Sequence, residues 1–184
     1  MRIGLYFGSF NPVHNGHLII AQHMMNSGHF DKIRFVVSPQ NPFKNANELL
    51  DENLRYKMVS LAIKNNPAFE VSDAELDLPK PSYTIQTLDY LIKTEKQNAF
   101  SIILGSDNME KLDKWKDIDQ ILRICDFHVY NRRGSQSISP KINANFTFHQ
   151  APFLDISATY IRELLHENKS VQYLVPDAIL KYLI

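Results

Sequence analysis

The chain has 184 residues, 44% of them hydrophobic, which is enough for one well-packed core and too little for two comfortably sized domains, so residues 1–184 should form a single domain. Twenty basic residues balance twenty acidic ones, so no overall field would draw the protein to nucleic acid or to an anionic membrane surface. The single cysteine, Cys125, excludes an internal disulfide, and the short apolar stretch after Met1 is neither a signal peptide nor a membrane span, so we expect a cytoplasmic protein.

Strand and helix patterns alternate along the chain. In chain order we expect a strand at 3–7, a helix at 18–25, a strand at 33–37, a helix at 54–62, a strand at 69–71, a helix at 85–92, a strand at 100–104, a helix at 118–125, a strand at 127–130 and two short helices opened by Ser157 and Pro176. Asp51 and the hydroxyls of residues 82–84 are the expected caps of the second and third helices. Residues 133–145 lack periodicity and are expected to form a surface loop. This alternation predicts a Rossmann-like α/β fold, a doubly wound, mainly parallel sheet with helices on both faces.

The loop after the first predicted strand carries residues that suit phosphate binding. Gly8 and Gly16 let the backbone approach a ligand closely, and the helix that begins near His17 offers free amides and the positive end of its dipole. His14 and His17 lie three residues apart, so both imidazoles could donate to the same phosphates and to charge that develops in a transition state. A lone histidine would more often be a cap or a surface residue. The loop lacks the third glycine of the dinucleotide-binding fingerprint, which disfavours hydride transfer. It also lacks a Walker-type Gly-Lys-Ser/Thr, which disfavours P-loop hydrolysis.

This loop resembles the first signature of the nucleotidyltransferase superfamily. Residues 8–17 read Gly-Ser-Phe-Asn-Pro-Val-His-Asn-Gly-His, whereas the family pattern is Gly-x-Phe-Asp-Pro-x-His-x-Gly-His, so Asn11 stands in place of an aspartate. Residues 156–162, Ile-Ser-Ala-Thr-Tyr-Ile-Arg, resemble the second signature, Ile-Ser-Ser-Thr-x-Ile-Arg, with Ala158 in place of a serine. Read alone, the second segment would be a helix cap followed by a solvated arginine. Together the two resemblances imply nucleotidyl transfer from ATP.

The segments between these signatures resemble one branch of the superfamily, the bacterial nicotinate-nucleotide adenylyltransferases, over nearly the whole chain. Residues 39–44 resemble a Pro-Pro-His-Lys loop, which implies that Lys44 meets phosphate. Residues 81–88 resemble Ser-Tyr-Thr-x-x-Thr-Leu, which implies that backbone amides near Thr84 bind the nicotinate carboxylate. Without the resemblance, these features would be a surface lysine and a helix cap.

Two further segments extend the resemblance. Residues 105–107 resemble a Gly-x-Asp that contacts the adenosine, and Trp115 matches a tryptophan that stacks on the pyridine ring. Arg132 and Arg133 follow the next predicted strand and could steer the polyphosphate. Read without the resemblance, these residues would be a turn aspartate, a core tryptophan and two solvated arginines.

The resemblance implies a full set of site residues and ligands. The catalytic residues would be His14, His17, Lys44 and Arg162. The ATP contacts would be Gly8, Ser9, Phe10, His14, Gly16, His17, Gly105, Asp107, Arg133, Ile156, Ser157, Thr159 and Arg162. The contacts with nicotinate mononucleotide would be Asn11, Lys44, Ser82, Tyr83, Thr84 and Trp115. Mg²⁺ would arrive with ATP, held by phosphates and water rather than by a dedicated protein cage.

The implied reaction joins ATP and nicotinate mononucleotide to give deamido-NAD and pyrophosphate. A phosphopantetheine adenylyltransferase would share both signatures but has no reason to carry residues 82–84 and Trp115 in these places. A preference for nicotinamide mononucleotide is a closer alternative, and a class I synthetase-like ligase or a non-catalytic nucleotide-binding module are more distant ones. We expect no nucleic-acid or membrane partner, and the oligomeric state stays open, with a homodimer as one possibility.

Overall fold

Six strands form one sheet in the computed structural model, which describes residues 1–40, 49–109, 111–132 and 145–184. The strands are β1 (Arg2–Gly8), β2 (Lys32–Val37), β3 (Phe69–Ser72), β4 (Ala99–Gly105), β5 (Asp126–Tyr130) and β6 (Phe146–His149). Their order across the sheet is β3-β2-β1-β4-β5-β6, and every neighbouring pair is parallel. The chain reverses its direction of travel across the sheet between β1 and β4, and ligands of such sheets bind at this switch point.

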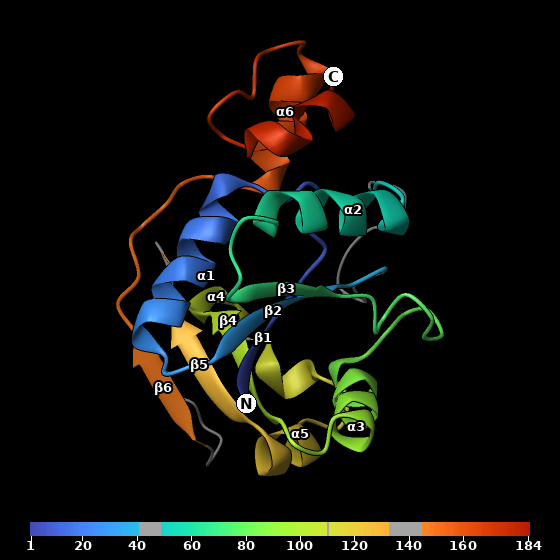
Figure 1. Cartoon of the computed structure of the whole chain (residues 1–184), viewed down its shortest axis with the longest axis vertical. Coiled ribbons are helices and arrows are strands. Elements are labelled where there is room, and N and C mark those ends of the chain that lie inside the picture. The colour runs from blue at the N-terminus through green and yellow to red at the C-terminus, as the bar shows by residue number, and fades with distance from the viewer. Residues whose placement is uncertain (41–48, 110, 133–144) are drawn as a thin grey trace.

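Helices cover both faces of the sheet. The α-helices are α1 (Asn15–Ser27), α2 (Glu52–Ile63), α3 (Thr84–Thr94), α4 (Ser106–Met109), α5 (Ile118–Ile124) and α6 (Ala158–His166), with 3₁₀ turns η2 (Leu112–Lys114) and η3 (Asp177–Tyr182). Figure 1 shows α1 and α2 on one side of the sheet, α3 and α5 on the other, and α6 beyond α1 and α2. The predicted Rossmann-like, doubly wound fold is therefore confirmed, and the described strands make the sheet wholly parallel rather than mainly so.

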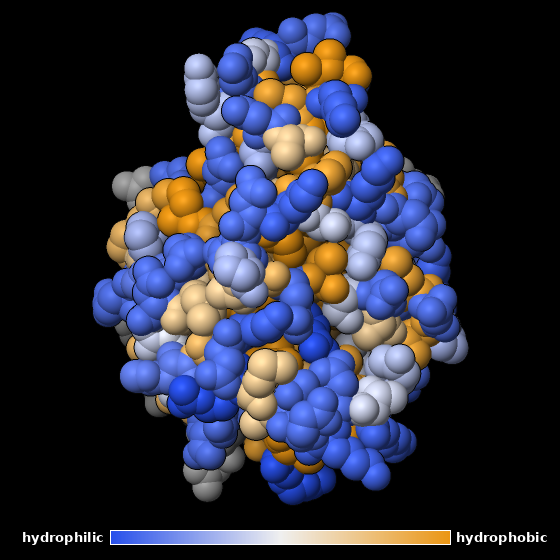
Figure 2. All heavy atoms as spheres, viewed as in Figure 1, coloured by the Kyte–Doolittle hydropathy of each residue, from blue (hydrophilic) through white to orange (hydrophobic). Residues whose placement is uncertain are grey.

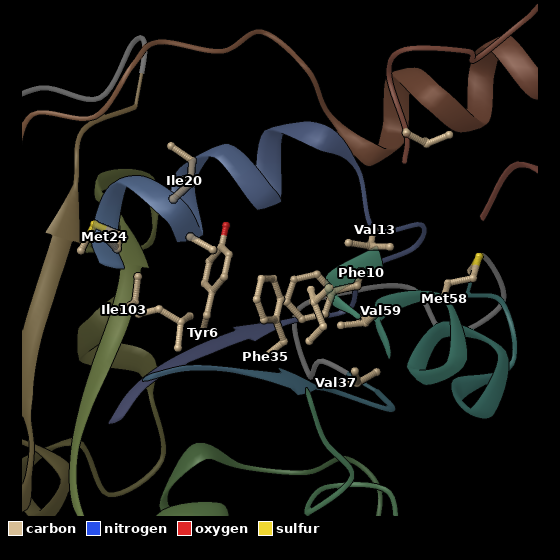
Figure 3. Close-up of a cluster of buried hydrophobic side chains, with 14 of the residues drawn as sticks. Tyr6, Phe10, Val13, Ile20, Met24, Phe35, Val37, Met58, Val59 and Ile103 are labelled. Atoms are coloured by element: carbon tan, nitrogen blue, oxygen red, sulfur yellow. The ribbon is translucent and has the colours of Figure 1, made fainter. Parts of the chain in front are cut away.

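A separate hydrophobic core fills each side of the sheet. Tyr6, Phe10 and Phe35 pack together between the strands and α1 (Figure 3), whereas Ile3 and Leu5 of the same β1 strand pack on the α3 side. Because β1 is buried from both sides, its loop leaves the sheet from a rigid base. Polar residues cover most of the face in Figure 2, and hydrophobic ones form smaller areas among them. Within the described part of the chain, no helix is both long and apolar enough to cross a membrane.

Two of the predicted caps are confirmed. Asp51 accepts the Leu54 N–H at 3.0 Å at the start of α2, and the Ser157 hydroxyl accepts the Tyr160 N–H at 3.1 Å at the start of α6. Cys125, just after α5, is a free and buried cysteine. The end of the chain differs in detail, because the segment after Pro176 is a 3₁₀ helix rather than an α-helix.

One prediction about the elements was wrong, and one strand was not predicted. The hydroxyls of residues 82–84 do not cap α3: its N-cap, Tyr83, makes no side-chain capping bond, and the Gln86 side-chain oxygen accepts the Tyr83 N–H at 3.3 Å. The Ser82 hydroxyl instead donates to Glu75 at 2.7 Å. Strand β6 was not expected at all, because four residues on a sheet edge give little pattern to detect. The loop predicted at 133–145 lies almost entirely outside the described residues.

Candidate active site

Two pockets meet at the carboxyl ends of β1 and β4. The first has a volume of about 460 Å³ and is lined by the loop after β1, the end of β5 and the segment that opens α6. The second has a volume of about 400 Å³ and is lined by the end of β4, the start of α3 and the segment around Trp115. The pockets share Tyr6, Phe7, Gly8, Asn108 and Tyr130. Groups bound in the two pockets would therefore meet over the end of β1.

The loop after β1 folds back over its own first glycine. Phe10 has a φ of 45°, which turns its ring toward Gly8, and a Cβ at Gly8 would lie only 2.8 Å from that ring. Glycine is therefore needed at this position. The buried Ser9 hydroxyl lines the first pocket, and within the described residues it has no hydrogen-bond partner. A buried hydroxyl of this kind is ready to bond a ligand.

Asn11 holds the loop through its neutral amide. Its side-chain oxygen accepts the Leu50 N–H at 3.0 Å, and its backbone carbonyl accepts a hydrogen bond from Arg162 at 2.9 Å. An amide oxygen makes the Leu50 contact as readily as a carboxylate oxygen, so this contact needs no charge at the position where the family pattern has aspartate. Asn11 lines the first pocket and not the second, so its predicted contact with nicotinate mononucleotide could arise only near the junction.

His14 and His17 form a reciprocal cap at the start of α1. The Nδ1 of His14 accepts the His17 N–H at 3.3 Å, and the Nδ1 of His17 accepts the His14 N–H at 3.2 Å. The two rings stack with centroids 3.6 Å apart. With each Nδ1 acting as an acceptor, the proton of each neutral ring sits on Nε2.

The electrostatic environment keeps His14 neutral. Burial, and to a smaller degree the positive charge of Arg132, lower the pKa of the His14 imidazole to about 4. At neutral pH the ring therefore carries no charge and keeps its Nε2 proton as a hydrogen-bond donor. Both histidines line the first pocket, as predicted for a pair that faces the same phosphates.

The second signature closes the same pocket. Arg162 reaches back from α6 to the Asn11 carbonyl, and its guanidinium also lies 3.4 Å from the Thr159 hydroxyl. Ile156, Ser157 and Thr159 line the first pocket together with Arg162. Ala158 and Thr159 at the start of α6 thus line the same pocket as Gly16 and His17 at the start of α1. This places two helix N-termini, whose dipoles favour an anion, on one pocket.

Arg132 lies beside these residues at the end of β5. It donates to the Asp107 carboxylate at 3.1 Å, and its backbone N–H donates to the Ser106 hydroxyl at 2.8 Å. Arg132 lines the first pocket, whereas Gly105, predicted as an ATP contact, lines the second. Asp107 lines neither pocket and acts here as the partner of Arg132. Lys44 and Arg133 lie outside the described residues, so their predicted roles stay predictions.

The second pocket combines an aromatic wall with positive charge. Ser82, Tyr83, Thr84 and Trp115 line it together, as the sequence predicts, and Lys114 and Lys116 flank the tryptophan. The Lys116 ammonium lies 4.6 Å from the centroid of the Tyr83 ring, a cation–π contact. A flat, anionic ring system would find stacking surface and positive charge in this pocket.

Sequence reasoning missed three features of the site. Glu75 is buried against the second pocket, in a segment between the strand predicted at 69–71 and the hydroxyls at 82–84 for which the sequence analysis predicts no role. Tyr6 and Tyr130 meet between the pockets with their oxygens 3.4 Å apart. Arg55 is fully buried and donates to backbone carbonyls of the loops around the site. A charged residue on the apolar side of a predicted helix was the one available signal for Arg55.

The chain is similar to a known family and to known proteins along most of its length. The cytidylyltransferase-like family model matches residues 5–164. A protein of Cytophaga hutchinsonii named probable nicotinate-nucleotide adenylyltransferase is 47% identical over 97% of this chain and 93% of its own length. A protein of the same name from Flavobacterium psychrophilum is 41% identical over 100% of this chain and 96% of its own.

Solved structures support the fold. A Plasmodium falciparum nicotinic acid mononucleotide adenylyltransferase complexed with NaAD matches with a TM-score of 0.80 at 19% identity, over 98% of this chain and 95% of that one. The match at this low identity bears on architecture alone. The family model and the relatives that are similar along their whole length lead to one assignment. The chain belongs to the cytidylyltransferase-like family and, within it, to the nicotinate-nucleotide adenylyltransferases.

Proposed function

We propose that the protein joins ATP and nicotinate mononucleotide to give deamido-NAD and pyrophosphate, the activity that the names of its relatives describe. The observation that carries this proposal is the pair of adjoining pockets at the switch point. One pocket has two helix N-termini and paired imidazoles, which suit a polyphosphate. The other has an aromatic wall and lysines, which suit an acidic pyridine nucleotide.

ATP occupies the first pocket in this proposal. Its phosphates lie between the starts of α1 and α6, within reach of His14, His17 and Arg162. The Ser9 hydroxyl, which has no hydrogen-bond partner among the described residues, is a further donor. We also assign Lys44 and Arg133 to the phosphates on the basis of the sequence. Six further predicted ATP contacts line the same pocket: Gly8, Phe10, Gly16, Ile156, Ser157 and Thr159. Gly105 and Asp107 do not line it.

Nicotinate mononucleotide occupies the second pocket. The pyridine ring stacks on Trp115, and the carboxylate points toward the first turn of α3 and the lysines beside the tryptophan. The 5′-phosphate then extends over Gly8 into the junction with the first pocket. This orientation places the attacking group of one substrate next to the phosphates of the other.

The reaction requires little acid or base chemistry from the protein. An oxygen of the nucleotide 5′-phosphate attacks the α-phosphorus of ATP, and the bond from that phosphorus to the pyrophosphate oxygen breaks. Because the attacking phosphate is already an anion, catalysis consists of in-line positioning and stabilisation of charge on the transferring group. The Nε2 protons of His14 and His17, and the guanidinium of Arg162, supply that stabilisation.

Mg²⁺ accompanies ATP in this proposal. Within the described ranges, the side chains that line the first pocket offer hydroxyl, amide, imidazole and guanidinium groups and no carboxylate. Mg²⁺ prefers oxygen ligands and keeps several of its waters. ATP oxygens and water would therefore hold the ion, which would lower the repulsion between the phosphates.

Pyrophosphate release tests the proposal directly. Purified protein with Mg-ATP should release pyrophosphate with nicotinate mononucleotide, and at least about tenfold more slowly with nicotinamide mononucleotide, because the amide lacks the negative charge that the second pocket attracts. Phosphopantetheine serves as the control acceptor for the rival activity and should give no release above background. Release with phosphopantetheine alone, or with none of the three acceptors, would contradict the proposal.

A further inference from the structure

Glu75 is a buried carboxylate that none of the roles above uses. Its exposed fraction is 2%, and it lines the second pocket beside the start of α3. Its Oε2 accepts the Ser82 hydroxyl at 2.7 Å, and its Oε1 accepts the Thr87 hydroxyl at 2.8 Å. Ser38, just after β2, lines the same pocket. The Glu75 carboxylate thus joins the segment after β3 to the first turn of α3.

The partners of Glu75 explain its position but not its charge. A buried carboxylate costs several kcal/mol of solvation free energy, and hydroxyl partners return only part of it. An ionised carboxylate accepts at both oxygens, which matches the two hydroxyls, whereas an amide has only one oxygen for both of them. In a Glu75→Gln variant, the amide nitrogen would replace one carboxylate oxygen, and this nitrogen cannot accept a hydrogen bond from the hydroxyl that faces it. The ionised carboxylate therefore holds residues 82–87 in a way that a neutral amide cannot.

Those residues form the part of α3 that faces the pocket. Ser82 and Thr87 stand on either side of the turn that contains Thr84 and Ile85, the first residues of the helix. The first backbone N–H groups of a helix have no intrahelical partner, so they point outward from the turn. Because Glu75 bonds the residues on both sides, it sets the direction in which these N–H groups face.

We propose that Glu75 is a positioning residue for the pyridine nucleotide: by holding Ser82 and Thr87 it aims the first-turn amides of α3 at the acid group of nicotinate mononucleotide. This inference rests on the proposed function. An acid group accepts from two aligned N–H donors, whereas a carboxamide presents one acceptor and one donor and cannot use both. Glu75 thus sets the preference for the acid over the amide, although it touches neither.

The variant Glu75→Gln tests this role by steady-state kinetics. The KM for nicotinate mononucleotide should rise about tenfold to a hundredfold, in line with loss of aligned hydrogen bonds to a charged group. The kcat and the KM for ATP should change less than about threefold, because the first pocket is unaffected, and kcat/KM for nicotinamide mononucleotide should also change little. The ratio between acid and amide substrates should therefore collapse.

Two further variants separate positioning from simple stability. Glu70→Gln removes a carboxylate of β3 that pairs with Arg34 at 2.6 Å and lines neither pocket, so it should lower thermal stability without changing the substrate ratio. If Glu75→Gln fails to fold, Thr87→Val keeps the carboxylate and removes one of the two hydroxyls. That variant should lower the substrate ratio about threefold to tenfold.

Binding without turnover distinguishes the two proposals. Trp115 is the only tryptophan, so quenching of its fluorescence reports binding of either nucleotide in the absence of ATP. Wild-type protein should bind the acid more tightly than the amide, and Glu75→Gln should lose this difference. A folded Glu75→Gln or Thr87→Val protein that keeps the wild-type ratio would overturn the role of Glu75 alone. Wild-type protein that neither binds nor turns over these nucleotides would overturn the proposed function as well.

Discussion

The imidazoles of His14 and His17 face the first pocket with their Nδ1 atoms already occupied by each other's backbone. The sequence predicts the pair as phosphate donors from spacing alone. The structure adds which nitrogen of each neutral ring carries the proton, because a nitrogen that accepts a hydrogen bond cannot also donate one. The pair can therefore stabilise charge as neutral donors, without a change of protonation state.

Replacement of His17 should separate its catalytic role from its capping role. His17→Gln keeps a side-chain oxygen that can accept the His14 N–H, as glutamine does in capping boxes, whereas His17→Ala loses that bond. Both variants should lower kcat about a hundredfold or more with little change in ATP affinity, since the lost donor acts in the transition state. Only His17→Ala should also lower the free energy of unfolding, by about 1 kcal/mol. Near-normal turnover in His17→Gln would remove the imidazole from catalysis.

At the same scale, Asn11 and Glu75 show the limit of sequence reasoning. Asn11 is visible in the sequence as a departure from the family pattern, but its hydrogen bond with the Leu50 N–H is visible only in the structure. Nothing local marks Glu75, because its partners Ser82 and Thr87 lie seven and twelve residues further along the chain. Contacts of this kind arise only when strands and helices are packed.

At the scale of elements, β6 takes part in a chain of hydrogen bonds that joins Ser27, His149 and His128 and that the sequence does not reveal. We call this chain the histidine relay. The Ser27 hydroxyl donates to the His23 carbonyl at 2.8 Å, so its oxygen accepts from His149 Nδ1 at 3.3 Å. The Nε2 of His149 is then an acceptor, and His128 Nδ1 donates to it at 2.9 Å. This chain of hydrogen bonds ties α1, β5 and β6 together and requires His149 to be neutral.

The relay should make stability depend on pH. Burial lowers the pKa of His128 to about 4, with a further contribution from His149, and burial also lowers the pKa of His149. A histidine whose pKa is lower in the folded state takes up its proton first in the unfolded chain. Stability is therefore complete above the unfolded pKa of 6.5 and is lost as the pH falls toward 4, by up to about 1.4 kcal/mol per pH unit for each group.

Chemical unfolding at pH 7.5, 6.5 and 5.5 measures this effect. His149→Gln should reduce the loss of stability between pH 6.5 and 5.5 by on the order of 1 kcal/mol, because one titrating group and its buried partner bond are removed. His14, whose pKa is also lowered, should maintain part of the slope. The exposed His166 on α6 provides the control, and His166→Gln should keep the wild-type slope. Equal slopes in both variants would exclude the relay as a source of the pH dependence.

At the scale of the whole molecule, Arg55 joins loops that lie beside the two pockets. Its side chain is fully buried and donates to the carbonyls of Ser9, Ser38, Pro39 and Leu50 at 2.6 to 2.8 Å. These carbonyls belong to the segments after β1 and β2 and to the approach to α2. A single guanidinium therefore satisfies backbone groups that would otherwise be buried without a donor.

Loss of this guanidinium should destabilise the whole protein. Arg55→Met fills a similar volume but leaves those carbonyls without a donor, and the free energy of unfolding should fall by about 3–5 kcal/mol. Arg55→Lys should cost less, because an ammonium can still reach one or two of the oxygens. Urea unfolding measures both variants, with Arg123→Met on the exposed face of α5 as the control. A loss below about 1 kcal/mol in Arg55→Met would contradict the role assigned to Arg55.

The sequence by itself determined the order of the main elements apart from β6, the Rossmann-like topology and the two signature loops, because each depends on short-range periodicity and on residues close together in the chain. Through the family resemblance it also indicated four residues that line the second pocket, namely Ser82, Tyr83, Thr84 and Trp115. Only the tertiary structure decided which loops meet: Glu75 with the start of α3, Arg55 with the loops around Ser9, and His128 with His149. These contacts join residues distant in the chain, and their energies depend on burial and on hydrogen-bond direction, which exist only in the folded protein.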